Sequence, residues 1–370
     1  MAESRERTSL TTPLTEVAEA GPEPAISKPA SGMRTTLLAI TKRLSFRRIS
    51  AVYIFAALFI IFSFWIPNTF LLSGTWRSLL DTQALTTIAA IGLVIPVAAG
   101  AFDLAVGTEV GVGAIFVAWL MSNAGLPMWP AIVIALAGGG LVGLVSGLLV
   151  TRVKIGSFIA TLGVSSVLTA LISWISGDQS ILNLPQSFQN LGTNQIIGLE
   201  LPFWIMLGVA LAASYILDAT PIGRRVYATG GNSEAARLAG VKTSRIVVGS
   251  LVACGAITAL AGILNSATLG AGDPTIGPPY LLPAFSAVFL GSTQFRDGRF
   301  NVWGTVVASY VLAVGVKGLQ LAGAPTWVPD LFDGVALLLA VGLAQLQSRS
   351  GQRHALVRLL RLGAARSSQE

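Results

Sequence analysis

Long apolar runs separated by short polar connections constrain the fold of this chain more than any other feature of its sequence. Most of the runs approach the ~20 residues that a helix needs to cross a ~30 Å hydrocarbon core. Only 11% of the 370 residues are charged and 53% are hydrophobic, whereas about a quarter of a soluble domain is charged. The composition therefore predicts an all-α, polytopic integral membrane protein of about ten transmembrane helices. The ten candidate spans are Ser50–Ile66, Ala84–Gly100, Asp103–Ser122, Pro130–Val150, Ile155–Ser176, Pro202–Asp218, Ile246–Thr268, Tyr280–Ser292, Asn301–Leu321 and Pro329–Gln345.

The distribution of basic residues predicts the orientation. Cytoplasmic loops of membrane proteins are enriched in Lys and Arg. With the N-terminus and the C-terminus inside, 22 of the 24 Lys and Arg residues are cytoplasmic, and only Arg77 and Lys317 lie near the outer face. The net charge of +7 is explained by this topology and gives no reason to expect nucleic-acid binding. The eighth span is short for a full crossing, which indicates a re-entrant or broken helix.

The two ends of the chain differ in composition from the apolar middle. Residues 1–33 are rich in Ser, Thr, Pro, Glu and Ala and lack the apolar stretch of a signal peptide, and the chain becomes basic from Arg34 on. We therefore expect a disordered cytoplasmic tail at residues 1–48. Residues 49–347 form the predicted transmembrane domain, with a cytoplasmic loop at 219–245. Residues 348–370 form a second basic tail.

The sequence offers little for catalysis. It contains no G-x-x-x-x-G-K-[ST] motif, so it cannot hold ATP phosphates by a P-loop. The single histidine, His354, lies in the C-terminal tail, and the single cysteine, Cys254, excludes a multi-cysteine metal site. We therefore expect no enzyme activity, no cofactor and no metal.

The longest polar segment inside the apolar region runs from Thr220 to Arg245, and its centre is predicted to be a short helix. Asn232 or Ser233 can cap the helix start, and Glu234 in the first turn suits the helix dipole. Ala235 and Ala236 favour helix, and Gly240 can end it in the left-handed conformation. Such an element, about two turns long and with small residues on its surface, suits docking into a partner's groove. The alternative is an ordinary loop with an incidental helical turn.

Acidic residues inside the apolar spans are scarce. Asp103 lies between the second and third spans, and Glu109 follows it in the third. Because a carboxylate in hydrocarbon is unfavourable, each should face a cavity, a partner or a helix end. One interpretation places both beside a translocation path. The other, which we favour for Asp103, makes it the cap of the third helix.

Lys317 is the one basic residue inside an apolar run, and Asp330 and Asp333 begin the next span. Lysine near the end of a span can extend its ammonium group to the interface. Either aspartate could also pair with it, and we expect a structural role. Glycine-bearing breaks recur near residues 100, 163 and 270, and such breaks occur both at transport paths and in tightly packed bundles.

Several segments, in order, resemble the permease subunits of the ribose/xylose-type ABC sugar importers. GAFDLAVG at residues 100–107 is similar to the family's GGIDLSVG, and FIATLG at 158–163 matches its FIATLG. TPIGRR at 220–225, with YA at 227–228 and GGN at 230–232, is similar to its T-x-x-G-R…YA-x-G-x-N. The resemblance covers roughly residues 50–345.

The resemblance implies a bacterial inner-membrane permease that works with a cytoplasmic ATP-binding subunit, a periplasmic or lipid-anchored solute-binding protein and a second permease copy, in contact with membrane lipid. It places the ATPase-coupling helix at Asn232–Gly240. The residues assigned to coupling are Gly223, Arg224, Arg225, Asn232, Glu234, Ala235, Ala236 and Gly240. Asp103, Glu109 and Thr161 are the candidates for the translocation path.

Departures from the family pattern leave the solute open. Ala101 and Ala105 replace Gly and Ser of the family motif, and Lys317 stands where an uncharged polar residue is common. The expected function is import of a monosaccharide or small polyol. The alternatives are a related importer of nucleosides or branched-chain amino acids, and a secondary carrier without an ATPase.

Overall fold

The computed structural model describes residues 50–294 and 298–342, and these residues are almost entirely helical. The predicted tails, 1–48 and 348–370, lie outside the described residues, as does the end of the tenth predicted span. The longer helices are α2 (Ser50–Trp65), α4 (Ser73–Ala98), α5 (Val106–Ser122), α6 (Met128–Thr151), α7 (Ser157–Ser176), α9 (Leu201–Ala219), α12 (Thr243–Leu269), α13 (Leu281–Ser292), α14 (Val302–Leu321) and a final helical segment at 327–342.

The predicted all-α membrane fold is confirmed. Six of these helices, α4, α6, α7, α9, α12 and α14, are long and apolar enough to cross a membrane, and two shorter apolar helices lie in α2 and α5. Helix α13 has only 12 residues, in agreement with the short eighth span expected from the sequence.

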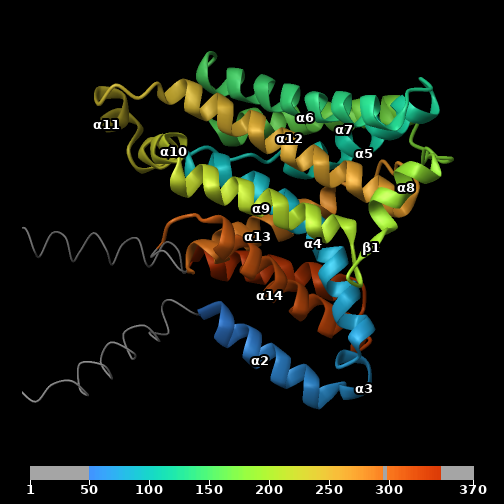
Figure 1. Ribbon diagram of the computed structural model, residues 1–370. Coiled ribbons are helices and arrows are strands. Elements are labelled where there is room, and N and C mark those ends of the chain that lie inside the picture. Colours follow the sequence, from blue (N-terminus) through green and yellow to red (C-terminus); the bar gives the residue numbers. More distant parts are fainter. Residues whose placement is uncertain (1–49, 295–297, 343–370) are drawn as a thin grey trace, which may run out of the picture. The chain divides into compact units, whose positions relative to one another are not determined.

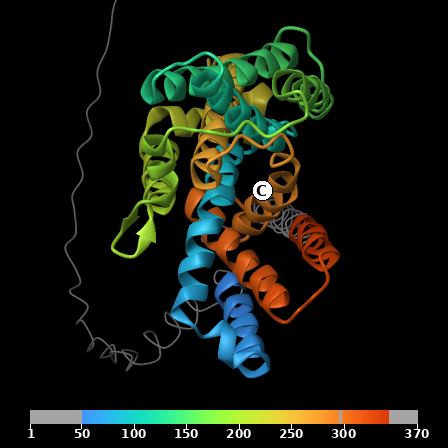
Figure 2. The ribbon, with the colours of Figure 1, turned by 90° about the vertical axis from the view of Figure 1, so that its right-hand side faces the viewer.

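Helices α4 and α12 form the centre of the bundle. Helix α12 packs along α4, α5 and α6, while α4 also contacts α9, α13 and α14 (Figure 2). Glycine permits the close approaches: a side-chain carbon at Gly139 of α6 would collide with the carbonyl oxygen of Gly255 on α12. The same holds for Gly262 of α12 against Val110 of α5. Small residues at such interfaces let helices associate in lipid.

Helix α4 differs from its prediction. The predicted span began at Ala84, but the helix begins at Ser73. The residues before Ala84 include Arg77, Asp81 and Gln83. Because these residues are polar, the first turns of the helix do not appear in the hydropathy pattern.

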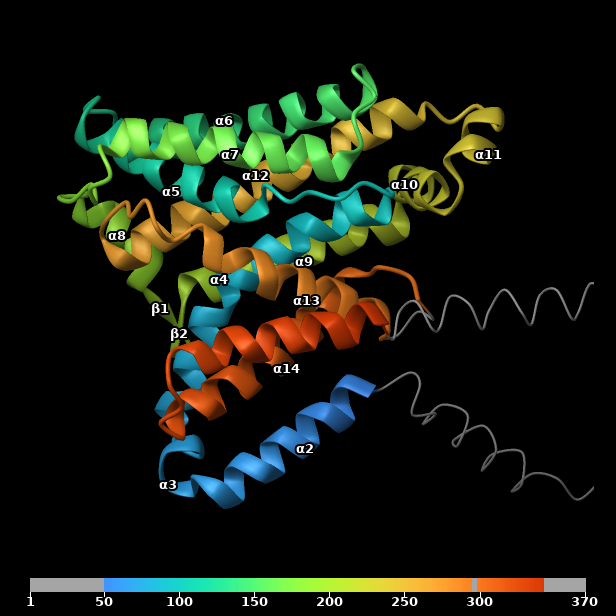
Figure 3. The same cartoon turned by 180° about the vertical axis from the view of Figure 1, so that it is seen from behind.

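Short elements occupy the two ends of the bundle. Helices α10 (Pro221–Gly231) and α11 (Ser233–Leu238) lie at one end, and α8 (Gln186–Thr193) with the hairpin β1 (Gln195–Ile196) and β2 (Leu199–Glu200) lies at the other (Figures 1 and 3). The structure also contains α3 (Pro67–Phe70) and a 3₁₀ turn, η1 (Pro278–Tyr280).

Candidate coupling element and intramembrane polar sites

The segment from Thr220 to Arg245 folds into two short helices rather than one. Thr220 caps α10, since its hydroxyl accepts a hydrogen bond from the Gly223 backbone N–H at 3.4 Å. Asn232 caps α11, and its side-chain oxygen accepts from the Ala235 N–H at 2.9 Å. The sequence left Asn232 and Ser233 as alternatives for this cap, and the structure selects Asn232.

Helix α11 ends at Gly240, as predicted from the sequence. Gly240 has φ of +85°, a left-handed conformation that a residue with a Cβ adopts only with strain. The Val241 N–H donates to the Ala236 carbonyl and the Gly240 N–H to the Arg237 carbonyl, both at 3.0 Å. This pair of bonds is the Schellman motif, which satisfies the carbonyl groups that a helix end leaves free.

The surface of α11 differs from the expected small-residue surface. Arg224, Arg225 and Ala235 are exposed, but Ala236 is buried with 7% exposure. Ala236 therefore packs inward and does not offer a surface to a partner. The largest apolar side chain presented by α11 is Leu238, which is 76% exposed. Leu238 was not among the residues predicted from the sequence, although its spacing of three residues from Ala235 places both on one helix face.

An ion pair supports α11 from outside. The Arg237 guanidinium donates to the Glu234 carboxylate, with the longer of two hydrogen bonds at 3.2 Å. The hydrogen bond and charge of Arg237 lower the pKa of Glu234 below its ordinary value. Both side chains are well exposed, so the pair contributes little to stability.

Helix α10 is held tightly against the bundle. A side-chain carbon at Gly223 would collide with the backbone of Leu217, and one at Gly230 with the carbonyl of Ala98 at the end of α4. A side-chain carbon at Gly100 would lie 3.2 Å from the Cα of Gly230. The GAFDLAVG segment and helix α10, which are distant in sequence, are therefore in backbone contact.

Asp103 and Glu109 meet in the interior of the bundle. Both are buried, and their carboxylate oxygens and the Cys254 thiol of α12 lie within 4.8 Å of one another. Glu109 Oε2 accepts a 2.7 Å hydrogen bond from the Thr258 hydroxyl. We call Asp103, Glu109, Cys254 and Thr258 the sealed cluster. Its spacing is compatible with a metal ion, which the sequence did not suggest because Cys254 comes from a helix far along the chain.

Asp103 is not the helix cap predicted from the sequence. The cap position of α5 is Ala105, and Asp103 Oδ1 accepts from the Ala105 N–H at 3.0 Å. The carboxylate thus stabilises the non-helical residues just before the helix. Thr161 is also buried, and its hydroxyl accepts from the Leu104 N–H at 3.0 Å and donates to the Ser157 carbonyl at 2.8 Å. It ties the same irregular segment to α7.

None of the three path candidates lines any of four cavities in the described part of the chain. A polar cavity of about 350 Å³ lies elsewhere, between α4, α13, α14 and the final helical segment. We call it the polar pocket. Its hydrogen-bonding side chains are Thr82, Gln83, Thr86, Lys317, Gln320 and Asp333.

Lys317 and Asp333 line the polar pocket together, but no ion pair joins them among the described residues, contrary to one expectation from the sequence. Thr82, Gln83 and Thr86 were missed because they fall before or at the start of the predicted second span. Their spacing of three and four residues, which places them on one face of a helix, was the available signal.

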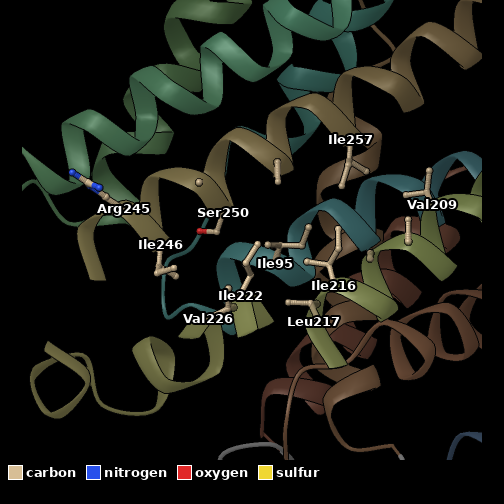
Figure 4. A pocket seen from close by; sticks show the side chains of 14 residues that line it. Ile95, Val209, Ile216, Leu217, Ile222, Val226, Arg245, Ile246, Ser250 and Ile257 are labelled. Carbon is tan, nitrogen blue, oxygen red and sulfur yellow. The ribbon is translucent and has the colours of Figure 1, made fainter. Parts of the chain in front are cut away.

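A larger cavity of about 480 Å³ lies between α9 and α12 (Figure 4). Ile95 of α4 also lines it, and α10 lies at one end. Its lining is apolar apart from Arg245 and Ser250, and the Ser250 hydroxyl donates to the Val247 carbonyl at 2.8 Å. Such a surface suits hydrocarbon rather than a polar solute.

The family model described as "Branched-chain amino acid transport system / permease component" matches residues 77–341. The ribose import permease protein RbsC of Escherichia coli K12 is 32% identical over 283 residues, covering 74% of this chain and 86% of RbsC. The L-arabinose permease AraH of Azospirillum brasilense is 30% identical over 84% of this chain and 90% of AraH.

The autoinducer 2 import permease LsrD of Yersinia enterocolitica is 28% identical over 69% of this chain and 78% of LsrD. No solved structure matches the chain significantly. The apolar helices, the capped element at one end of the bundle and these matches agree with one another, and the chain belongs to the family of transport-system permease components that this family model describes.

Proposed function

We propose that this chain is the transmembrane permease subunit of an ATP-driven importer and carries a monosaccharide or a similar small polyol. The observation that carries the proposal is the similarity to ribose and arabinose permeases over about three quarters or more of this chain and 86–90% of theirs. ATP hydrolysis belongs to a separate cytoplasmic subunit, since the sequence has no P-loop. A solute-binding protein delivers the solute on the other side of the membrane.

Coupling to the ATP-binding subunit uses α11. This helix is capped at both ends, and α10 connects it to the bundle by backbone contact with the end of α4. A rigid, capped helix transmits a displacement, and α4 extends from that contact to the polar pocket. From Ala98 to Gln83 the rise along α4 is roughly 22 Å. A movement of α10 and α11 can therefore reach the interior of the bundle through one helix.

We expect the permease to act as a homodimer in the bacterial inner membrane, with both termini cytoplasmic. Helix α7 supports this assembly, because only 22% of the residues in its apolar stretch are buried within one copy. It also exposes Ser166 and Thr169 beside apolar residues such as Trp174.

The test replaces Leu238 by glutamate. A carboxylate on the exposed apolar face of α11 should weaken docking in a partner groove, because the charge would have to be desolvated there. We expect at least a tenfold loss of the co-purified ATP-binding subunit, with membrane abundance unchanged. Leu182→Glu is the matched control, since Leu182 is 59% exposed in the connection before α8.

Two results would contradict the proposal. Normal retention of the ATP-binding subunit by Leu238→Glu would show that α11 is only a loop element, as the alternative interpretation holds. Solute uptake by the purified chain without an ATP-binding subunit would identify a secondary carrier. The native mass of the intact complex checks the stoichiometry, and a single permease copy would contradict the homodimer.

A further inference from the structure

The polar pocket has a location that polar side chains do not occupy without a partner or water. Gln83 and Thr86 lie roughly 15 and 20 Å along α4 from its first residue, at the start of the apolar part of this helix. Lipid would not compensate their hydrogen-bonding groups, so such residues face protein or a water-filled cavity. The pocket of about 350 Å³ supplies that cavity.

The lining is neutral as a whole and rich in hydrogen-bonding groups. Lys317 offers only donors, Asp333 only acceptors when ionised, and the glutamines and threonines offer both. The Gln83 amide also donates to the Ser309 hydroxyl at 2.7 Å, which fixes its orientation. A lining of this kind suits an uncharged solute whose groups both donate and accept. Hydroxyl groups have that property.

Apolar residues complete the lining of the pocket. Leu79, Leu312 and Val316 supply carbon surface next to the polar groups. Ligand sites commonly combine a few placed polar groups with an apolar wall, at volumes of about 300–1,000 Å³. A sugar presents hydroxyl edges and C–H faces, so both parts of this lining have a counterpart on it.

We propose that the polar pocket is a contact site for a small polyhydroxylated solute on its way through the permease, with Asp333, Gln320 and Thr86 as its hydrogen-bonding residues. This assignment rests on the proposed function and adds to it the residues that touch the solute. It replaces the path candidates Asp103, Glu109 and Thr161, which are enclosed in the bundle.

The first arm of the test measures water access without requiring transport. Gln320→Cys and Thr86→Cys are made in a Cys254→Ser background, embedded in nanodiscs and treated with a charged methanethiosulfonate reagent. We expect both cysteines to react, because this reagent needs an ionised thiol and therefore water. Leu211→Cys on α9, a 54% exposed position among apolar residues, is the matched control and should react at least tenfold more slowly.

The second arm measures uptake by the complete transporter in proteoliposomes, with D-ribose, L-arabinose and L-leucine as probes. Asp333→Asn and Gln320→Leu should each slow sugar uptake about three- to tenfold, the equivalent of one lost hydrogen bond. Retention of the ATP-binding subunit and membrane abundance should not change. Gln179→Leu, an exposed glutamine in the connection after α7, should transport at the wild-type rate.

The outcomes separate the two proposals. If the wild-type complex carries neither sugar, the proposed function fails whatever the labelling shows. If it carries a sugar and the pocket variants match the wild type, or if the introduced cysteines do not react, the pocket assignment is overturned. If L-leucine is the probe carried and the variants slow its uptake, the pocket binds a zwitterion and the polyhydroxylated class is wrong.

Discussion

The sealed cluster and the polar pocket both place acidic groups within the helical bundle, yet their surroundings are opposite. In the sealed cluster, Asp103 and Glu109 are enclosed by glycine-mediated contacts between α5, α6 and α12. In the polar pocket, Asp333 shares a cavity with a lysine, two glutamines and two threonines that leave room for a solute. Scarcity of acids in apolar spans led the sequence analysis to the first site, whereas free volume distinguishes the second.

The difference separates two uses of polar groups in a membrane protein. The sealed cluster stabilises an irregular backbone, because Asp103 accepts from the Ala105 N–H. Thr161 of α7, which is not part of the cluster, accepts from the neighbouring Leu104 N–H. Non-helical backbone at this depth requires such partners because lipid offers none. In the polar pocket, Thr82 and Gln320 are exposed, and accessible polar groups are what a transient contact with a solute requires.

The largest expected difference in stability between the two sites comes from replacing a glycine at each site by a larger side chain. Gly255→Leu places its first side-chain carbon against the Gly139 carbonyl oxygen and 3.2 Å from Glu109 Oε1. Because backbone on both helices would have to move, we expect destabilisation of about 3 kcal/mol or more and loss of the folded protein from membranes. Gly334→Leu, beside Asp333 and with open space around it, should accumulate normally.

Fluorescence-detected size-exclusion chromatography of membrane extracts measures both variants. Normal accumulation of Gly255→Leu would mean that the sealed cluster is loosely packed. The two sites would then not differ in packing.

A smaller effect should follow from matched threonine substitutions. Thr258→Val removes the hydroxyl that donates to Glu109 Oε2 and leaves a buried acceptor without that partner, at a cost of about 1–3 kcal/mol. Thr86→Val in the polar pocket should change stability by less than about 0.5 kcal/mol, because its hydroxyl faces a cavity. Thermal denaturation in detergent measures the stability of both variants.

Uptake provides the complementary measurement for the same pair. Thr86→Val should slow sugar uptake, and Thr258→Val should leave the rate per folded transporter unchanged. The reverse pattern would place the solute at the sealed cluster.

The smallest effect is expected for Lys317→Met. Breaking a buried ion pair would destabilise the protein by about 3–5 kcal/mol, but no ion pair of Lys317 occurs among the described residues. We therefore expect a stability change within about 0.5 kcal/mol. A fall of several kcal/mol in thermal or denaturant stability would show that Lys317 and Asp333 are paired and that the polar pocket is closed in the membrane.

The segment from Thr220 to Arg245 shows how far local sequence rules reach. Asn232 as a cap, Glu234 in the first turn and Gly240 as a left-handed stop depend on residues three or four positions apart, and the structure confirms each of these local roles. Whether Ala235 or Ala236 faces outward depends instead on how α11 packs on α10 and α12, so the burial of Ala236 could not be read from the sequence.

The sequence by itself determined the membrane class, the order of the apolar helices and the left-handed end of α11 at Gly240, because these depend on hydropathy and local backbone conformation. The family resemblance also followed from ordered local motifs such as GAFDLAVG. Tertiary structure alone decided that Asp103 and Cys254 meet across distant segments and that Gly100 touches Gly230. It also decided that Gln83 and Asp333 share a cavity, because the packing of helices fixes which polar groups retain free volume beside them.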